Sequence, residues 1–316
     1  MTKFMLASDA IIEKIKFPCL VQPKIDGVRF GHLIGKPTGR SLKQHKNRYA
    51  NNFFENEVFN GFDGEMACDQ DQTHPDLCRI TSSALGTYEG QPFLKWWIFD
   101  VFNEDSYDLN YFDRYKLAIQ KVNHLHRIYP GLLPHLEVVP SFPCASLNDL
   151  LGYEEDFLEL GYEGVIVRDP NARYKQGRST VREGGLLRIK RFIEAEARII
   201  EVVEGETNNN EAQIDERGYT FRTSHKANKV GNGMVGSIIG QLLENVYSPF
   251  DNKLLFEVGQ TVTISPGSLT HDERRYYWEH QGQILYKISK FKLFPKGIKD
   301  KPRFPTHVCF RNEEDL

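Results

Sequence analysis

The chain has 316 residues, of which 40% are hydrophobic and 26% are charged, and its formal net charge is −3. This composition is typical of a globular protein with room for two domains of ordinary size. No apolar run approaches the roughly 20 residues of a membrane span, and the N-terminal residues lack the apolar core of a secretory signal. We therefore expect a cytoplasmic protein without membrane contact, placed in the host cytoplasm if the chain is viral.

The cysteines are scattered and contain no C-x-x-C pair. They are Cys19, Cys68, Cys78, Cys144 and Cys309. An odd number at irregular spacing argues against a disulfide framework and against a zinc site. The cysteines therefore favour a reducing compartment.

Residues 11–103 are predicted to form mostly short strands separated by turns. The stretch VQPKIDGVRFGHLIG (21–35) is typical of two strands around an Asp26-Gly27 turn. Lys24 is its unusual residue, because a lysine is seldom buried in a strand unless it is paired or takes part in chemistry. The alternative is a surface strand with alternating polar residues. Further strands are expected at 61–68 and 95–103.

The pattern of the sequence changes near Glu194. Before it, the pattern predicts helices over 111–127 and 146–160, the second capped by Ser146 and ended by Gly161. Strands are expected over 161–170 and 185–192. After a polar loop with three consecutive asparagines (208–210), five or six short strands in about 120 residues predict a small β-barrel.

Polar side chains are embedded in the apolar strands of the first domain. They are Lys24, Asp26, Arg29, Asp63, Glu65, Asp100, Glu163, Arg188 and Lys190. Any one of them could be a surface residue, but together they indicate a groove that joins cations to carboxylates. Such a groove suits a nucleoside triphosphate with a divalent metal. The chain has neither a P-loop nor a Rossmann glycine motif.

A lysine at a nucleotide site without a P-loop suggests covalent chemistry. Its amine can attack the α-phosphate and expel pyrophosphate, which leaves a phosphoramidate. At a reference pKa of about 10.4, only about one lysine in a thousand is neutral near pH 7.4. We expect Arg29, Lys190 and a bound Mg²⁺ to lower the pKa of Lys24.

The segment KIDGVR (24–29) resembles the K-x-D-G-x-R signature of the covalent nucleotidyltransferases, which include ATP-dependent DNA ligases, RNA ligases and mRNA capping enzymes. Five further segments resemble the later motifs of that superfamily in the same order. They are GRSLK (39–43), FDGEM (62–66), WWIFDVF (96–102), YEGVIVR (162–168) and LLRIKRF (186–192). The C-terminal stretch FKLFPKGIKDKPRFPTHVCFR (291–311) is similar to the final motif of short ATP-dependent DNA ligases of bacteriophage type. The resemblance covers roughly residues 20–311.

This resemblance implies an α+β fold. Residues 1–193 would form an adenylation (nucleotidyltransferase) domain with ATP-grasp-like antiparallel sheets and helices, and residues 194–316 an OB-fold β-barrel. A hinge is expected at 194–196. The implied activity is ATP-dependent sealing of 3′-hydroxyl/5′-phosphate nicks in duplex DNA, through a lysyl-AMP and an adenylated DNA end, in DNA replication, repair and recombination.

The resemblance also implies catalytic roles. Lys24 would be the nucleophile that becomes AMP-lysine, and Lys190 would contact the α-phosphate. Glu163 and Glu65 would hold Mg²⁺, for which Mn²⁺ can substitute, and Glu65 could also bind the ribose.

Nucleotide contacts are implied for a further set of residues. Gln22 would accept a hydrogen bond from the exocyclic amine of adenine, and Phe99 would stack on the base. Arg29 would lie at the nucleotide and the nick. Arg188 stands where the family commonly has the first lysine of a K-x-K motif, and it keeps the charge but not the geometry of a lysine.

The remaining implied contacts involve the 5′-phosphate and pyrophosphate. Arg40 would engage the 5′-phosphate of the nick, although GRSLK lacks the serine that commonly precedes this arginine. Arg303 and Arg311 of the barrel domain would orient pyrophosphate as the leaving group.

The expected partners are ATP and nicked duplex DNA, bound by a monomer. Residues 287–311 contain six lysines and two arginines against one acid, Asp300, which suits a polyanion. The alternatives are an RNA ligase, a GTP-using capping enzyme and a non-catalytic nucleic-acid-binding module. The roles of two segments stay open. Residues 78–90 could be a DNA-facing segment or an ordinary loop, and residues 271–280 could be a helix on the barrel or a DNA-facing element.

Overall fold

The computed structural model describes residues 2–249, 252–298 and 300–311. It divides into two compact units, Met1–Lys190 and Arg191–Leu316, called here the N-terminal unit and the C-terminal unit. This division falls three residues before the boundary expected after residue 193. No helix among the described residues has the length and apolar character needed to cross a membrane.

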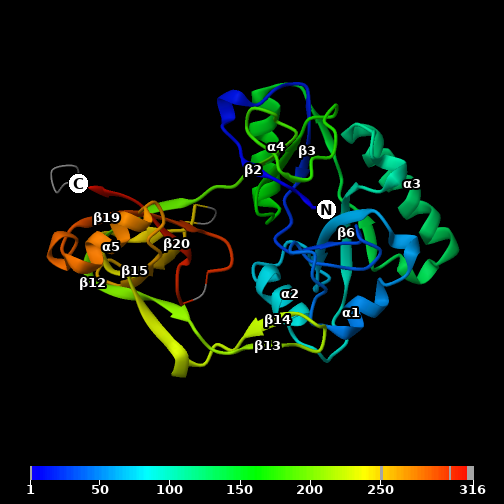
Figure 1. The fold of residues 1–316 in the computed structure, drawn as a ribbon. Helices are drawn as coiled ribbons and strands as arrows, with labels where there is room; N and C mark the ends of the chain where they lie inside the picture. The colour runs from blue at the N-terminus through cyan, green and yellow to red at the C-terminus, as the bar shows by residue number, and fades with distance from the viewer. Residues whose placement is uncertain (1, 250–251, 299, 312–316) are drawn as a thin grey trace. The chain divides into compact units, whose positions relative to one another are not determined.

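The N-terminal unit contains two main sheets (Figure 1). One has the strand order β2-β11-β9-β3-β8 and the other the order β4-β5-β6-β7. The strands of the first are β2 (Ser8–Asp9), β11 (Leu186–Ile189), β9 (Val165–Arg168), β3 (Cys19–Pro23) and β8 (Phe142–Cys144). Those of the second are β4 (Val28–Gly31), β5 (Phe62–Ala67), β6 (Lys95–Val101) and β7 (Leu136–Val138). A separate parallel pair joins β1 (Met5–Leu6) to β10 (Gly177–Arg178).

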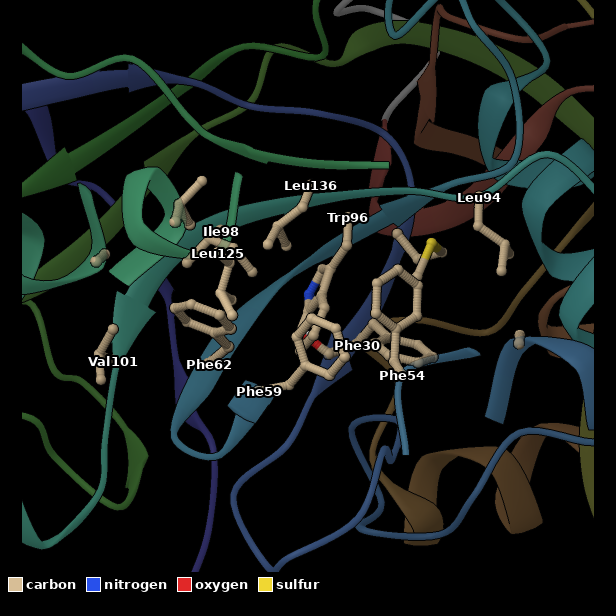
Figure 2. Packing of buried hydrophobic residues seen from close by; sticks show 14 of the residues in the cluster. Phe30, Phe54, Phe59, Phe62, Leu94, Trp96, Ile98, Val101, Leu125 and Leu136 are labelled. Carbon is tan, nitrogen blue, oxygen red and sulfur yellow. The ribbon is translucent and has the colours of Figure 1, made fainter. Parts of the chain in front are cut away.

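The four-stranded sheet packs on an aromatic core (Figure 2). Trp96 lies at its centre, fully buried, with its ring centroid 5.0 Å from that of Phe30 and 5.1 Å from that of Phe54. Its indole nitrogen donates a hydrogen bond of 3.0 Å to the Phe30 carbonyl. Edge-to-face aromatic pairs add to the stabilisation from area burial. The core therefore buries one face of the four-stranded sheet.

The helices of the N-terminal unit pack on these sheets. They are α1 (Arg48–Phe53), α2 (Leu77–Gly86), α3 (Tyr111–Ile128) and α4 (Leu147–Glu159). The two predicted helices are confirmed as α3 and α4, and the Ser146 side chain accepts a hydrogen bond from the Asp149 amide as the N-cap of α4. The expectation of mostly strands over 11–103 is wrong for α1 and α2. Segment 78–90 is therefore largely helical, and Thr81 packs inward to accept a hydrogen bond from the Cys68 amide.

The two strands around Asp26 and Gly27 do not form a hairpin. β3 belongs to the five-stranded sheet and β4 to the four-stranded sheet, so the chain crosses between sheets at this point. A Cβ atom on Gly27 would lie 2.3 Å from the Met66 carbonyl oxygen, and the crossing therefore requires glycine. The surface-strand alternative is wrong as well, because Asp26 and most of β3 are buried.

The C-terminal unit is built around a five-stranded sheet with the order β18-β15-β12-β19-β20. Its strands are β12 (Ile193–Asn208), β15 (Lys229–Leu242), β18 (Thr261–Ile264), β19 (Ile288–Phe294) and β20 (Arg303–Arg311). An isolated bridge between Ser265 and Thr306 connects the two ends of this order, so the sheet closes into the predicted small barrel. Residues 194–196 pair with β19 inside β12, which is incompatible with the expected hinge position.

Shorter elements complete the C-terminal unit. They are β13 (Ala212–Ile214), β14 (Thr220–Arg222), β16 (Val246–Tyr247), β17 (Leu254–Phe256) and α5 (His271–Glu279). The expected polar loop after β12 contains the β13–β14 hairpin. Segment 271–280 forms a helix on the barrel: Arg274 donates to the Val235 carbonyl at 2.7 Å, and Tyr277 and Trp278 pack on the barrel core.

Candidate active site

A pocket of about 270 Å³ is lined by both main sheets of the N-terminal unit. Its walls include seven of the residues predicted from the sequence: Gln22, Lys24, Arg29, Arg40, Glu65, Phe99 and Arg188. Along one row of the five-stranded sheet, Ile166 of β9 pairs with Gln22 on one side and with Arg188 on the other. Directly paired residues on neighbouring strands point to the same face, so these three side chains form part of one wall.

Lys24 leaves the end of β3 next to Glu163. Its amide donates to the Gly164 carbonyl and its carbonyl accepts from the Glu163 amide, both at 2.9 Å. These bonds continue the β3–β9 pairing and place the lysine amine in an ion pair with the Glu163 carboxylate. Gly164 has a φ of +149°, and a Cβ atom there would lie 2.3 Å from the Ile189 carbonyl oxygen. Glycine therefore permits the close approach of these strands.

Glu163 also binds Lys190, whose Nζ lies 2.5 Å from Oε1 of the carboxylate. One buried carboxylate thus bridges two lysines that are 166 residues apart in the sequence. The Glu163 side chain is only 3% exposed, and those of Lys24 and Lys190 are 20% and 14% exposed. Removing one partner of such a buried charge group leaves the others uncompensated, at a typical cost of about 3–5 kcal/mol.

The charges of this group set the pKa values of its members. Burial alone would raise the pKa of Glu163, but Lys24 and Lys190 lower it to about 2. Burial alone would lower the pKa of Lys24, but Glu163 and Glu65 outweigh it, and the pKa of Lys24 is raised. For Lys190 burial prevails and lowers the pKa. The expectation that protein cations lower the pKa of Lys24 is therefore wrong, because the carboxylates of Glu163 and Glu65 have the larger effect on that pKa and raise it.

Glu65 lies on β5 directly opposite Arg29 of β4. Burial raises its pKa to about 7, against the opposing effects of Lys24 and Arg29, whereas the ordinary value is 4.5. Glu65, which lines the pocket, and Glu163, which pairs with the pocket residue Lys24, are therefore two carboxylates with well separated proton affinities. Such separation is common where acidic groups take different roles in a reaction.

We predict that Glu65→Gln changes the pH dependence of stability. Because folding raises the pKa of Glu65, its proton stabilises the folded state below pH 4.5, and this contribution is lost as the pH rises towards 7. The difference in unfolding free energy, variant minus wild type, should grow by about 2 kcal/mol from about pH 5 to about pH 8, a value reduced because the side chain is partly exposed. Urea unfolding at both pH values measures it, with Glu13→Gln as an exposed control. An equal difference at both pH values contradicts the prediction.

Phe99 occupies an irregular position of β6. Its neighbours Ile98 and Asp100 pair with Gly64 and Asp63, which are consecutive on β5, so Phe99 is the extra residue of a β-bulge. Bulges re-aim side chains, and Phe99 lines the pocket. Behind it, Asp100 binds Arg114 at 2.7 Å and Arg168 at 3.1 Å, all fully buried or nearly so.

Gln22 is 1% exposed, and its amide nitrogen donates to the Val139 carbonyl at 3.4 Å. The Tyr115 hydroxyl donates to the same carbonyl at 2.9 Å. If the side-chain amide of Gln22 were reversed, its oxygen would face the Val139 carbonyl oxygen. The Val139 carbonyl therefore favours the orientation in which the amide nitrogen of Gln22 donates to it. In that orientation the side-chain carbonyl is left as an acceptor on the pocket side.

Three predicted arginines have different surroundings. Arg40 is exposed at the pocket rim. Arg303 and Arg311 lie on β20 of the C-terminal unit, where Arg303 donates to the Lys296 carbonyl at 3.1 Å and Arg311 to the Glu196 carboxylate at 3.2 Å. The roles expected for these residues stay predictions.

Part of the pocket wall was not predicted from the sequence. Leu6, Ala7, Val139, Arg168 and Arg178 also line the pocket. Arg168 had a signal, because it is a charged residue at the end of the apolar run VIVR and is only 2% exposed. Val139 contributes through its backbone, for which the sequence offers no signal.

The chain is similar over nearly its whole length to solved structures of DNA ligases. Two structures of a Chlorella virus DNA ligase-adenylate are 28% and 30% identical to it, cover 98% and 99% of this chain and 100% and 99% of their own, and each has a TM-score of 0.51. A Lig E DNA ligase is 20% identical, covers 98% of this chain and 100% of its own, and has a TM-score of 0.66. No protein-family model and no curated protein matches the chain. These likenesses confirm the predicted fold class, a nucleotidyltransferase domain followed by an OB-fold.

Proposed function

The chain belongs to the family of ATP-dependent DNA ligases, and from this premise we propose that it seals 3′-hydroxyl/5′-phosphate nicks in duplex DNA through a lysyl-AMP and an adenylated DNA end. The observation that carries the proposal is the Lys24–Glu163–Lys190 group beside a pocket with an aromatic ring and an amide acceptor. Lys24 would supply the attacking amine, Lys190 would bind the phosphates of ATP, and the aromatic ring and the amide acceptor would bind its base.

In the first step, Nζ of Lys24 attacks the α-phosphorus of ATP. A phosphorus–nitrogen bond forms, the bond from the α-phosphorus to the bridging oxygen breaks, and pyrophosphate leaves. The ammonium must lose its proton first. Because Lys24 and Lys190 lower the pKa of Glu163, we assign to this carboxylate the positioning of the lysine, while the proton passes to phosphate or solvent. Lys190 and Arg188 neutralise phosphate charge.

The donor set fits Mg²⁺, or Mn²⁺ in its place. Among the residues that the structure describes, no three ligating side chains cluster as a metal site, but Mg²⁺ is commonly held by one or two carboxylates together with substrate phosphates and water. Glu163, ionised by its lysine neighbours, and Glu65 would be those carboxylates. When bound with ATP, the metal supplies positive charge at the phosphates.

The later steps use DNA. The 5′-phosphate attacks the phosphorus of lysyl-AMP to give adenylated DNA, and the 3′-hydroxyl then attacks that end and releases AMP. We assign Arg40 to the 5′-phosphate, and Arg303 and Arg311 to pyrophosphate in the first step. Because the expected hinge lies inside β12 and Lys190 is held by Glu163, we place the flexible connection at residues 191 and 192, just before β12.

Binding to DNA should depend on its phosphates, since a sealing enzyme cannot depend on sequence. The basic stretch 287–311 of the C-terminal unit suits that contact. We infer that the enzyme acts as a monomer on nicked duplexes, in replication, repair and recombination, in the cytoplasm.

We predict that Gln22 makes the enzyme select the 6-amino group of adenine. Its pocket-side carbonyl can accept a hydrogen bond from that group. Transfer of the nucleoside monophosphate to Lys24 should be about tenfold more efficient from ATP than from purine-riboside triphosphate, which lacks the amine. In Gln22→Met the preference should fall to near unity. Single-turnover labelling with both nucleotides measures it, and a Gln22→Met variant that keeps the full preference contradicts this role.

A substrate panel tests the proposed function. The protein is incubated with ATP and Mg²⁺ on nicked DNA, nicked RNA and single-stranded RNA, and GTP replaces ATP in a parallel series. We expect sealing of nicked DNA with ATP. Preferred joining of RNA strands would favour an RNA ligase, labelling by GTP alone a capping enzyme, and binding of DNA without covalent labelling a non-catalytic module.

A further inference from the structure

The N-terminal strap, residues 3–9, docks along the nucleotide pocket. Its strand β1 pairs in parallel with β10, and β2 pairs in parallel with β11. Leu6 and Ala7 line the pocket. The strap therefore forms part of the pocket wall, although no motif of the sequence pointed to it.

Phe4 fixes the position of the strap. Its side chain is only 2% exposed and fills a slot over Gly31 of β4. A Cβ atom on Gly31 would lie 2.4 Å from Cε1 and 2.7 Å from Cζ of the Phe4 ring. Any larger residue at position 31 would therefore push the ring out of its slot, and the missing side chain of Gly31 is matched to Phe4.

The Phe4 ring contacts the guanidinium of Arg29, which in turn contacts Phe99. The Cζ atom of Arg29 lies 4.8 Å from the centroid of each ring. These are distances of favourable cation–π contact. Phe4, Arg29 and Phe99 thus form one continuous stack, which runs from the strap to the ring that we assign to adenine.

Hydrogen bonds hold the middle of this stack. Arg29 binds both carboxylate oxygens of Asp63, at 2.7 and 2.6 Å, and donates to the Met5 carbonyl at 2.9 Å. The Tyr174 hydroxyl donates to Asp63 at 2.7 Å and accepts from the Met5 amide at 2.9 Å. These bonds fix the plane of the guanidinium and tie it to the strap, so displacing Phe4 disturbs Arg29 directly.

We propose that Phe4 is a positioning residue for ATP: through Arg29 it sets the orientation of the Phe99 ring against which the base binds. This inference rests on the proposed function and deepens it. Arg29 then acts chiefly by holding Phe99, because its Nε and Nη2 atoms are bonded to Asp63 and Met5. Phe4 contacts Arg29 and does not itself line the pocket, so its effect falls on nucleotide binding rather than on the chemical step.

The test separates binding from chemistry. The rate of lysyl-AMP formation is measured against ATP concentration in wild type, Phe4→Leu and Gly31→Ala. Phe4→Leu keeps an apolar side chain but removes the ring, and Gly31→Ala displaces the ring from the other side. Both should raise the ATP concentration for half-maximal rate about tenfold, and both should leave the limiting rate within about threefold of wild type.

Phe54→Leu is the matched control. Phe54 is a fully buried phenylalanine of the aromatic core, and it does not line the pocket. The Phe54→Leu substitution should lower the melting temperature without changing how the rate of lysyl-AMP formation depends on ATP concentration. Unchanged ATP dependence in folded Phe4→Leu and Gly31→Ala, or an equal change in Phe54→Leu, overturns the inference and leaves the proposed function standing. Absence of labelling in the wild type instead counts against the proposed function.

Discussion

Replacing Lys24 with alanine is expected to abolish the joining of nicked DNA, by at least roughly 10⁴-fold in single-turnover rate. The variant lacks the amine that lies beside Glu163 at the pocket, so no lysyl-AMP can form. The last step needs no lysine nucleophile, because the 3′-hydroxyl attacks an end that already carries AMP. Lys24→Ala should therefore still seal a nick prepared with an adenylated 5′ end.

Lys175→Ala is the matched control for this variant. Lys175 also pairs with a glutamate, Glu183, at 2.7 Å, but the pair lies on the surface, and the variant should join nicks like the wild type. Sealing of unmodified nicks by Lys24→Ala would contradict the covalent mechanism. Failure on both the unmodified and the pre-adenylated nick, in a variant that is still folded at the assay temperature, would assign Lys24 to the final step as well.

Replacing Glu163 with glutamine is expected to slow lysyl-AMP formation about 10²-fold or more. The glutamine cannot bridge two ammonium groups by charge, so Lys24 and Lys190 lose the group that holds them together. The pKa of Lys24 should fall in the variant, because Glu163 is the strongest of the charges that raise it. The rate should therefore rise with pH over a lower range than in the wild type, while its maximum stays reduced.

Glu183→Gln provides the comparison. The pKa of Glu183 is also lowered to about 2, by hydrogen bonds with Lys175 and Thr180, but Glu183 pairs with the surface residue Lys175 and not with Lys24 or Lys190. Both variants lose a strongly acidic carboxylate, and only Glu163→Gln should lose adenylation. Single-turnover labelling between about pH 6 and pH 10 measures both rates. Equal losses in the two variants would mean that stability, and not the site, governs the effect.

The sequence predicts which residues gather at the site better than how they are held. The motif order allowed Lys24, Glu65 and Phe99 to be selected from one chain, and the structure brings them to one pocket, while their roles stay predictions. The direction in which the pKa of Lys24 shifts could not be predicted, because it depends on how close the Glu163 and Glu65 carboxylates lie to the lysine amine. That closeness follows from strand register and from Gly164, and both are properties of the folded sheets.

The errors in the fold have physical reasons. Asp26-Gly27 carries the signal of a hairpin turn, but the same dipeptide also suits a crossing in which the backbone passes close to Met66. α2 was missed because serine, threonine and β-branched residues interrupt its pattern, although Leu77, Thr81 and Leu85 are buried at helical spacing. Long-range contacts such as the docking of Phe4 over Gly31 have no local signal, since 27 residues separate the two positions.

Covalent labelling tests the central claim most directly. The protein is incubated with α-³²P-ATP and Mg²⁺, with pyrophosphatase to remove the product, and is then denatured and separated by electrophoresis. We expect a labelled protein band that is absent in Lys24→Ala and that loses its label when nicked DNA is added. A wild-type protein that takes no label, and whose intact mass shows no AMP carried from expression, would contradict the lysyl-AMP mechanism.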